Sequence, residues 1–335
     1  MEQKERKEII SRKWFLVIIA IWILLLVGGG YLFSRWYKPK IEPITITLEN
    51  KENKDAVEKW VKNPTVLLKN TTSTCTLKLD DGTYRMYFMA EGGIHYADSA
   101  DGQTFSPKIA TGVKESSGKM LSNPAVIKIN NGKWIMIYEE QAINRMTFTE
   151  ERGPGPGSQR NLMLASSADG KKFTKVGIAI DSSKEDNYFA SVPDLIKLPD
   201  GRFRMYYVSG GEAIGSAISE NGGSWKREPG YRLEDRAVDP NVKYENGKWV
   251  MYFSTLPKPE MKERNAIFKA TSKDGLTWEK DGKKLIEPDT ADGFVVDPDV
   301  VKTKDGYRMF FGESKGGVNA QGSPIDLYFA DWKTQ

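Results

Sequence analysis

The chain has 335 residues, of which 39% are hydrophobic and 28% charged, with a formal net charge of +4 at neutral pH. Its basic residues are interspersed with acidic ones, so there is no basic block of the kind that binds nucleic acid. A single cysteine and a single histidine exclude an internal disulfide and most zinc sites and histidine-dependent triads.

The N-terminal part of the chain contains a long apolar segment. Residues 14–34 carry no charged side chain, and at 1.5 Å per residue this length spans a hydrocarbon core of about 30 Å. A cleavable signal peptide is the alternative, but its apolar region would be shorter and would precede a small-x-small cleavage site, which this sequence lacks. We therefore predict a tail at 1–13, a single transmembrane helix at 14–35 and a stalk at 36–57.

The charges on the two sides of this helix predict its orientation. Five basic residues precede it and three follow it closely. Because cytoplasmic flanks carry the excess of Lys and Arg, the N-terminal tail is expected in the cytoplasm. The rest of the chain would then lie outside the cytoplasm, anchored to the cell membrane.

The remaining chain repeats one pattern five times. Each copy has an extended run, an Asp-Gly or Asn-Gly pair, and a second run rich in aromatic residues and methionine. The pair predicts a two-residue hairpin, because both of its positions tolerate a positive φ. A third strand follows after a loop of variable length. The copies occupy residues 73–88, 122–138, 191–207, 238–253 and 296–311.

Four copies continue into a second short motif. In this motif a Ser and an Asp or Asn side chain can cap a tight turn, while Gly supplies the φ that the turn needs. The motif resembles the Asp-box of sialidases, one residue short, and the resemblance implies a structural turn. The four sequences are SADGQTF (99–105), SADGKKF (167–173), SENGGSW (219–225) and SKDGLTW (272–278).

Five such units predict an all-β fold, a five-bladed β-propeller of four-stranded antiparallel blades. The last copy ends after a third strand, so its fourth strand must come from elsewhere. Residues 58–68 read like 276–288, which lead from the second motif into an outer strand. We predict that 58–68 complete the last blade, which makes 58–335 one domain.

Carboxylates gather where the predicted inner strands begin. The first strand of a propeller blade starts on the rim to which the second strand returns, so strand starts and the loops after second strands share that rim. Loops on a rigid scaffold are a common place for binding. Asp239 and Asp297 occupy the same position, directly before a proline, in neighbouring blades. We predict that this pair contacts a ligand.

Other polar residues of the same rim are predicted to bind substrate, namely Asn123, Asp194, Glu91, Glu139, Arg145, Arg236 and Arg264. The alternative is that each Asp-Pro only caps the loop before its strand, by accepting main-chain hydrogen bonds. The oxygens of Asp194, Asp239, Asp297 and Asp299 would suit calcium, but the sequence has no dedicated calcium loop. We predict no cofactor, with calcium left open as the alternative.

The pattern DPxV…DGxYRMYY…TSxDGxxW, which covers residues 58–335, resembles the five-bladed propeller glycoside hydrolases of families 43, 62, 32 and 68 and the related mannoside phosphorylases of family 130. The resemblance implies an enzyme that cleaves or transfers sugars such as arabinose, xylose, fructose or mannose. It also implies carboxylates at inner-strand starts, one acting as acid and one as base or nucleophile. For family 43 it implies an Asp base, a helper Asp and a Glu acid.

This chain departs from that pattern, because no inner-strand start holds Glu. Asp239 and Asp297 fill two of the five positions, and the others hold Ser73, Asn123 and Val192. The catalytic acid would then come from a loop. Its candidates are Glu139, Glu140 and Glu313.

We therefore predict a membrane-anchored, extracytoplasmic carbohydrate-active protein. In the first hypothesis it is a glycosidase acting on a glycan or oligosaccharide, with Asp239, Asp297, Glu140 and Glu313 as catalytic residues. In the second it is a non-catalytic propeller that binds a glycan or a protein at the cell surface, which the missing Glu favours. A third is an envelope scaffold without a small ligand, because a fold alone does not decide function.

Overall fold

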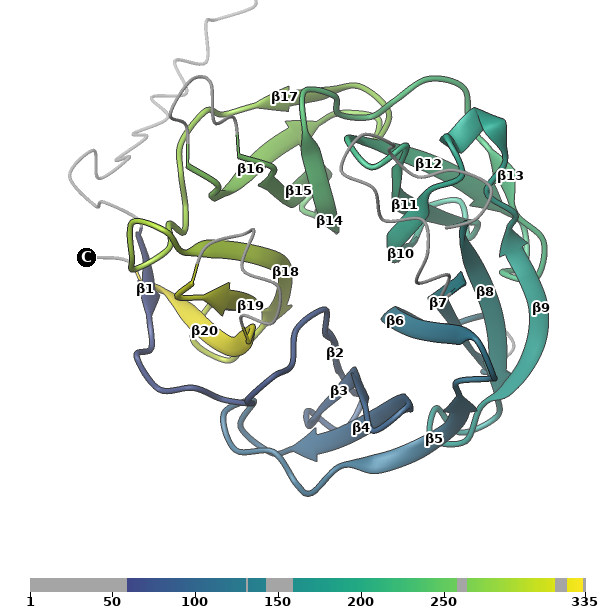
Figure 1. Ribbon diagram of the computed structural model, residues 1–335, viewed down its shortest axis with the longest axis horizontal. Coiled ribbons are helices and arrows are strands. Elements are labelled where there is room, and N and C mark those ends of the chain that lie inside the picture. The colour runs from purple at the N-terminus through teal and green to yellow at the C-terminus, as the bar shows by residue number, and fades with distance from the viewer. Residues whose placement is uncertain (1–58, 131, 143–158, 258–263, 317–323, 334–335) are drawn as a thin grey trace, which may run out of the picture. The chain divides into compact units, whose positions relative to one another are not determined.

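The computed structural model describes residues 59–130, 132–142, 159–257, 264–316 and 324–333. In these residues, five antiparallel sheets of four strands each are arranged around one axis, like the blades of a propeller (Figure 1). The prediction of an all-β, five-bladed propeller is confirmed. The predicted tail, transmembrane helix and stalk, at 1–57, lie outside the described residues. Within the described part of the chain, no helix is both long enough and apolar enough to cross a bilayer.

The blades follow one another along the chain. Blade 1 contains β2 (Cys75–Lys78), β3 (Tyr84–Ala90), β4 (Gly93–Ser99) and β5 (Ile109–Lys114). Blade 2 contains β6 (Lys119–Lys128), β7 (Trp134–Ala142), β8 (Arg160–Ser167) and β9 (Thr174–Ile180), and a short 3₁₀ helix η2 (Lys184–Asp186) follows it. Blade 3 contains β10 (Ala190–Lys197), β11 (Phe203–Ser209), β12 (Ala213–Ser219) and β13 (Lys226–Arg227). Blade 4 contains β14 (Ala237–Glu245), β15 (Lys248–Thr255), β16 (Ile267–Ser272) and β17 (Trp278–Lys280). Blade 5 contains β18 (Phe294–Lys302), β19 (Tyr307–Ser314), β20 (Asp326–Lys333) and, from the start of the described chain, β1 (Lys59–Lys62).

The hairpins between first and second strands turn at the predicted glycines, but the predicted two-residue turn holds fully only in blade 4. There Asn246 and Gly247 have φ of 51° and 76° and separate two paired strand ends. In blade 1 the Leu79 N–H donates to the Thr83 carbonyl oxygen, and the Gly82 N–H donates to that of Leu79. These bonds close a three-residue loop, in which only Gly82 has a positive φ. Blades 2 and 3 repeat those backbone hydrogen bonds. A type I turn followed by one left-handed glycine explains this difference, because it needs a positive φ at only one position.

The Asp-box-like turns connect neighbouring blades. In blade 2, Ser167 Oγ accepts a hydrogen bond from the Gly170 N–H at 3.0 Å, and Asp169 Oδ1 accepts from the next two main-chain N–H groups. The turn formed in this way presents the Gly170 carbonyl oxygen to blade 1, where the Tyr87 hydroxyl donates to it at 2.6 Å. The Tyr206 hydroxyl of blade 3 donates in the same way to the Gly275 carbonyl oxygen of blade 4. In blade 5 the Arg308 guanidinium donates instead, to the Gly102 carbonyl oxygen of blade 1.

The hydrophobic core consists of five clusters, one at each junction between adjacent blades. Each second strand contributes the methionine of its repeat, fully buried from solvent. These methionines are Met86, Met136, Met205, Met251 and Met309. The repeated methionine therefore makes the same kind of packing contact in every blade, and these contacts hold adjacent blades together.

The ring closes between the two ends of the described chain. Strand β1 pairs antiparallel with β20, with Lys59 opposite Lys333, and an isolated bridge joins Leu68 to Leu327. Trp60 is 5% exposed and packs in the cluster between blades 4 and 5. Because Lys59 lies beside Lys333 at the end of β20, the chain enters the propeller on the side of the hairpin turns.

Candidate functional site

At or near the start of each inner strand lies a residue whose backbone is left-handed. We call these five residues the first layer; their φ values lie between 44° and 55°, and they are Ser73, Asn123, Val192, Asp239 and Asp297. In blades 2 to 5 the strand register shifts at this residue, which marks a β-bulge, and a proline follows. A residue before proline normally has an extended backbone, so a positive φ at these positions is strained.

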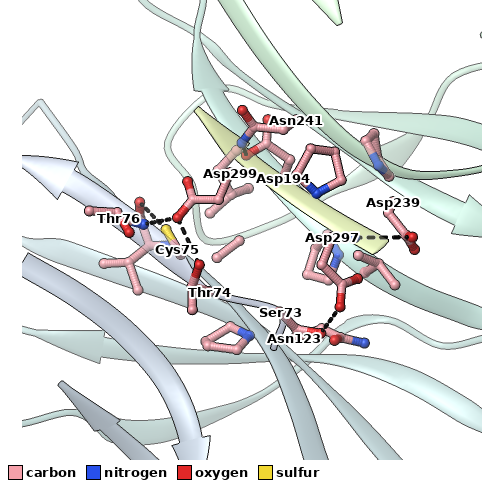
Figure 2. A pocket seen from close by; sticks show the side chains of 18 of the residues that line it. Ser73, Thr74, Cys75, Thr76, Asn123, Asp194, Asp239, Asn241, Asp297 and Asp299 are labelled. Carbon is pink, nitrogen blue, oxygen red and sulfur yellow. Dashed lines mark hydrogen bonds between the residues drawn. The ribbon is translucent and has the colours of Figure 1, made fainter. Parts of the chain in front are cut away.

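The equivalent residues two positions further along form a second layer, namely Cys75, Ala125, Asp194, Asn241 and Asp299. Both layers line one cavity of about 60 Å³ on the propeller axis (Figure 2). A water molecule needs roughly 10–15 Å³ of such space. The cavity therefore has room for a few waters, and a sugar ring would have to lie over its mouth.

The second layer joins four of the five blades to the next blade. Its acceptor atoms receive hydrogen bonds from main-chain N–H groups of the following inner strand. The pairs are Cys75 Sγ with Val126 N (3.3 Å), Asp194 Oδ2 with Val242 N (2.7 Å), Asn241 Oδ1 with Val300 N (3.0 Å) and Asp299 Oδ2 with Thr76 N (2.8 Å). Ala125 is the one member without an acceptor. Asp194, predicted to bind substrate, thus has a partner within the fold.

Burial changes the acidity of the second-layer carboxyl groups. Removal from water raises the pKa of Asp299 to about 6, although the nearby Lys243 charge and the Thr74 and Thr76 donors act in the opposite direction. Burial also raises the pKa of Asp194. Because desolvation disfavours the charged form, these joints weaken as the carboxyl groups ionise.

Asp239 and Asp297 are neighbours in the first layer. The Asp297 main-chain N–H donates to Asp239 Oδ2 at 3.3 Å, as Figure 2 shows. Asp297 Oδ2 in turn accepts hydrogen bonds from the hydroxyl groups of Thr72, at 2.7 Å, and Ser73, at 2.6 Å. The pair predicted from the repeated Asp-Pro therefore meets at the axis, and its two members have different donors.

These donors give the two carboxyl groups different protonation tendencies. Burial is the main reason why the pKa of Asp239 is raised to about 8, and the charge of Asp297 raises it further. Burial also raises the pKa of Asp297, but the Ser73 and Thr72 hydroxyl groups favour its ionised form. Burial therefore favours the protonated form of Asp239, whereas the hydroxyl donors of Asp297 act in favour of its ionised form.

A third carboxylate approaches this pair from the second strand of blade 2. Glu139 is 1% exposed, and its charge adds to the rise in the pKa of Asp297. Arg160 Nη1 lies 3.1 Å from Glu139 Oε1, while Asn123 Nδ2, at 2.7 Å, and the Ser191 hydroxyl donate to Oε2. Glu139 is thus the predicted glutamate that the structure brings to the first layer.

Glu140 and Glu313 lie elsewhere. Neither lines the axial cavity. Glu140 is buried and paired with Lys119. Glu313 is also buried; its Oε2 lies 2.8 Å from Lys62 Nζ of the closing strand β1, and its Oε1 accepts from the Asp289 N–H. Their predicted catalytic roles stay predictions, and the contacts seen here are those of residues that hold strands together.

The remaining predicted substrate-binding residues also lie outside the axial cavity. Glu91 is exposed and pairs with Lys108. Arg264 donates to the carbonyl oxygens of Pro288 and Thr290 at 2.9 and 2.5 Å. Arg236 has a positive φ of 63° in the segment that leads into β14. Arg145 lies outside the described residues.

Sequence reasoning did not assign the hydroxyl groups around the pair. Thr72 and Ser73, which are adjacent in the chain, donate to Asp297, and Ser191 donates to Glu139 beside it. One signal was available. The first repeat lacks Asp-Pro and has a run of hydroxyl residues at 71–74 in its place.

The described residues contain no group of three or more His, Cys, Asp or Glu side chains arranged to hold a metal ion. Asp194 and Asp299, which were expected to suit calcium, direct oxygens at main-chain N–H groups of the next blade. The chemistry that this arrangement supports directly is proton transfer between carboxyl groups and a bound molecule.

No protein-family model matches the chain, and no curated protein matches it by sequence. Solved structures of glycan-active enzymes do resemble it. An α-L-arabinofuranosidase from Lactobacillus brevis has a TM-score of 0.60 at 16% identity, over 81% of this chain and 92% of that one. An endo-arabinase from Bacteroides thetaiotaomicron has a TM-score of 0.58 at 15% identity, over 80% of this chain and 98% of that one.

A β-1,3-galactosidase of family GH43 has a TM-score of 0.58 at 13% identity. The match covers 80% of this chain and 59% of the galactosidase, so this chain spans about three fifths of that protein. The fold is that of these propellers. At such identities the likeness concerns the fold, and the function has to be argued from the site.

Proposed function

We propose that this propeller is a glycoside hydrolase that acts at the mouth of the axial cavity, with Asp239 and Asp297 as its catalytic residues. One observation carries the proposal: two buried carboxyl groups meet at the axis, one favouring its protonated form and the other held by hydroxyl donors. Glycoside hydrolysis needs this division of labour between an acid and a base or nucleophile. The fold shared with arabinan- and galactan-active enzymes supports the choice of substrate class.

The chemistry follows from the two protonation tendencies. Asp239 gives its proton to the glycosidic oxygen, so that the leaving alcohol departs neutral as the bond to the anomeric carbon breaks. Asp297 either removes a proton from an attacking water or attacks the anomeric carbon itself. Which of these occurs depends on the separation of the two carboxyl groups with substrate bound, about 6.5–9.5 Å for inversion and about 5–5.5 Å for retention.

This proposal assigns the acid to Asp239 instead of Glu140 or Glu313. Both glutamates lie outside the lining of the axial cavity and are paired with lysines. Glu139 is likewise bound by Arg160. Its charge beside Asp297 suits a positioning residue that orders Asn123 and Ser191 around the pair.

We further propose that the N-terminal segment at 14–35 anchors the propeller to the cell membrane, with the propeller outside the cytoplasm. The apolar length and the flanking charges support this. The chain enters the propeller at β1 on the side of the hairpin turns. The first layer lies at the other ends of the inner strands.

The test is hydrolysis of aryl glycosides of arabinose, xylose and galactose by the full chain in detergent. The proposal expects turnover of at least one substrate, and loss of that turnover in Asp239→Asn when the leaving group is a poor one. With an activated leaving group such as dinitrophenol, which needs less protonation, Asp239→Asn should keep much more of its rate. Equal losses with both leaving groups would contradict the assignment of Asp239 as acid.

A second function, glycan binding without catalysis, is favoured by the size of the axial cavity. At about 60 Å³ it cannot enclose a sugar ring. In addition, the left-handed first-layer backbone occurs in all five blades, including the three without Asp. If no aryl glycoside is hydrolysed while the full chain still binds oligosaccharides, this second function replaces the first.

A further inference from the structure

A larger hollow lies on the opposite side of the propeller, between blades 1 and 5. Its volume is about 670 Å³, within the range of about 300–1,000 Å³ that is usual for ligand sites. It is lined by the ends of β2 and β20, by the hairpin between β18 and β19, and by the Asp-box-like turn of blade 1. Inner strands begin at the axial pair and end here, so this groove and the first layer lie on opposite faces.

Two aromatic residues of the groove lining, Tyr307 and Trp332, direct their rings toward the cluster between blades 4 and 5. Tyr307 is half-buried, and its hydroxyl donates to Glu245 of the neighbouring hairpin. Trp332 is half-buried and packs edge-on against Trp60, with ring centroids 5.2 Å apart. These contacts hold this side of the groove in place before any ligand arrives.

The charges of the groove are close to balance, and part of them is neutralised internally. Four basic and three acidic side chains line it. Arg308 Nε and Nη2 lie 2.7 and 3.0 Å from the two carboxylate oxygens of Asp331. Asp101 Oδ1 accepts hydrogen bonds from its own turn. This lining does not favour a strongly charged ligand, since neither sign is in clear excess.

Polar side chains line the groove and are available to a ligand. Within the described residues, the side chains of Gln103 and Thr303 form no hydrogen bond, and both line the groove. Lys78, also in the lining, lies over the Tyr84 ring, 5.8 Å from its centroid. An amide, a hydroxyl and an ammonium group in a lining of balanced charge match a neutral ligand with many hydroxyl groups.

We propose that this groove is a second, non-catalytic binding site for a neutral oligosaccharide chain. The class of ligand rests on the proposed function, because a glycan-cleaving propeller is the reason to expect such chains nearby. A site on the far face from Asp239 and Asp297 would hold a polymer without occupying the reacting pair. The propeller would then stay on its substrate between cleavage events.

The test measures binding separately from cleavage. The full chain in detergent carries Asp297→Asn, which removes hydrolysis, and is titrated by calorimetry with arabinopentaose and with β-1,3-galactotriose. Adding Gln103→Ala and Thr303→Ala is expected to weaken binding of the better probe about tenfold, since two hydrogen bonds are lost. Lys171→Ala is the matched control, because Lys171 occupies in the blade 2 turn the place of Gln103 in the blade 1 turn.

Either of two results would overturn this proposal: no binding of either probe, or binding that the groove substitutions leave unchanged. Hydrolysis of aryl glycosides is measured separately with the protein that retains Asp297, with and without the groove substitutions. This measurement tests the proposed hydrolase activity independently of groove binding. Groove binding without any hydrolysis would leave this site standing and remove the proposed activity. Hydrolysis without groove-dependent binding would do the reverse.

Discussion

Asp297 and Asp299 lie two residues apart on β18 and are both withdrawn from water at the axis, but they use their oxygens differently. Asp299 accepts the Thr74 hydroxyl and, in addition, the main-chain N–H of Thr76 of the next blade, a donor that cannot move without moving the strand. Asp297 accepts the hydroxyl groups of Thr72 and Ser73, and a hydroxyl can rotate away. The type of donor therefore separates a carboxylate that joins blades from one that is free to react.

The same comparison extends around the ring. The second layer joins blades through four of its five members, whether the acceptor is a carboxylate, an amide or a thiol. The first layer shares its backbone conformation in all blades but carries carboxyl groups in only two. Repetition of a contact indicates structure, and departure from the repeat indicates the place where chemistry can occur.

The largest expected effect is on turnover in Asp297→Asn. We expect hydrolysis to fall about 10²–10⁴-fold, because the residue that activates water or attacks the sugar is lost. The fold should be retained, because an asparagine oxygen can still accept from Thr72 and Ser73. Initial rates on the best aryl glycoside, together with a circular dichroism melt, check both parts. Unchanged turnover would remove Asp297 from the mechanism.

The second prediction concerns pH. Because Asp239 must be protonated to act as acid and its pKa is raised to about 8, the rate should fall as the pH rises through about 8. In Asp239→Asn this loss at alkaline pH should be absent, since the titrating group is gone. The measurement is kcat/KM from pH 5 to pH 10 for both proteins. An alkaline fall that persists in the variant would assign it to another group.

The third prediction concerns stability in the second layer. The folded pKa of Asp299, about 6, lies above the unfolded value of 3.8, so its contribution to stability is fully present below pH 3.8 and is lost as the pH rises through about 6. Asp299→Asn does not titrate, and blade 4 already uses Asn241 for the same joint. We expect the variant to be about 1–3 kcal/mol more stable than the parent at pH 8, and to differ little at pH 4.

Denaturant unfolding at those two pH values measures this difference, with Asp81→Asn as a control in an exposed hairpin. A variant that is less stable than the parent at pH 8 would show that the charge itself strengthens the joint.

The smallest expected effect is relief of backbone strain at Val192. This β-branched residue has a φ of 44°, a conformation that asparagine adopts more readily. Asn123 occupies the equivalent position in blade 2 with a φ of 51°. Val192→Asn should therefore raise the free energy of unfolding by about 1 kcal/mol, read from the denaturation midpoint. Destabilisation would mean that the contacts of the valine outweigh its strain.

Much of the fold could be predicted from the sequence, because the repeat is written in turn residues and strand patterns. Asp-Gly and Asn-Gly pairs, the Asp-box-like motif and the truncated last copy indicate five blades and a borrowed strand. The turn type in blades 1 to 3 was not predictable in the same way. An Asp-Gly or Asn-Gly pair fits both a two-residue turn and a type I turn followed by glycine, so the sequence does not distinguish the two.

Only those residues of the candidate site that occupy equivalent positions in the repeats could be predicted from the sequence. Asp239 and Asp297 could be paired because equivalent strand starts meet at the axis. The roles of the glutamates could not be separated, because Glu139 and Glu140 are adjacent in one strand and point to opposite faces. Glu313 was misleading for another reason, since its partner Lys62 lies at the other end of the propeller sequence.

The most direct test of the account compares Asp297→Asn with Asp299→Asn in one experiment, measuring aryl glycoside turnover and the free energy of unfolding at pH 8. The account predicts a crossed result. Asp297→Asn should lose turnover and keep a parent-like stability, while Asp299→Asn should keep turnover and gain stability. If the two variants change turnover and stability in the same way, the separation of a reacting layer from a joining layer is wrong.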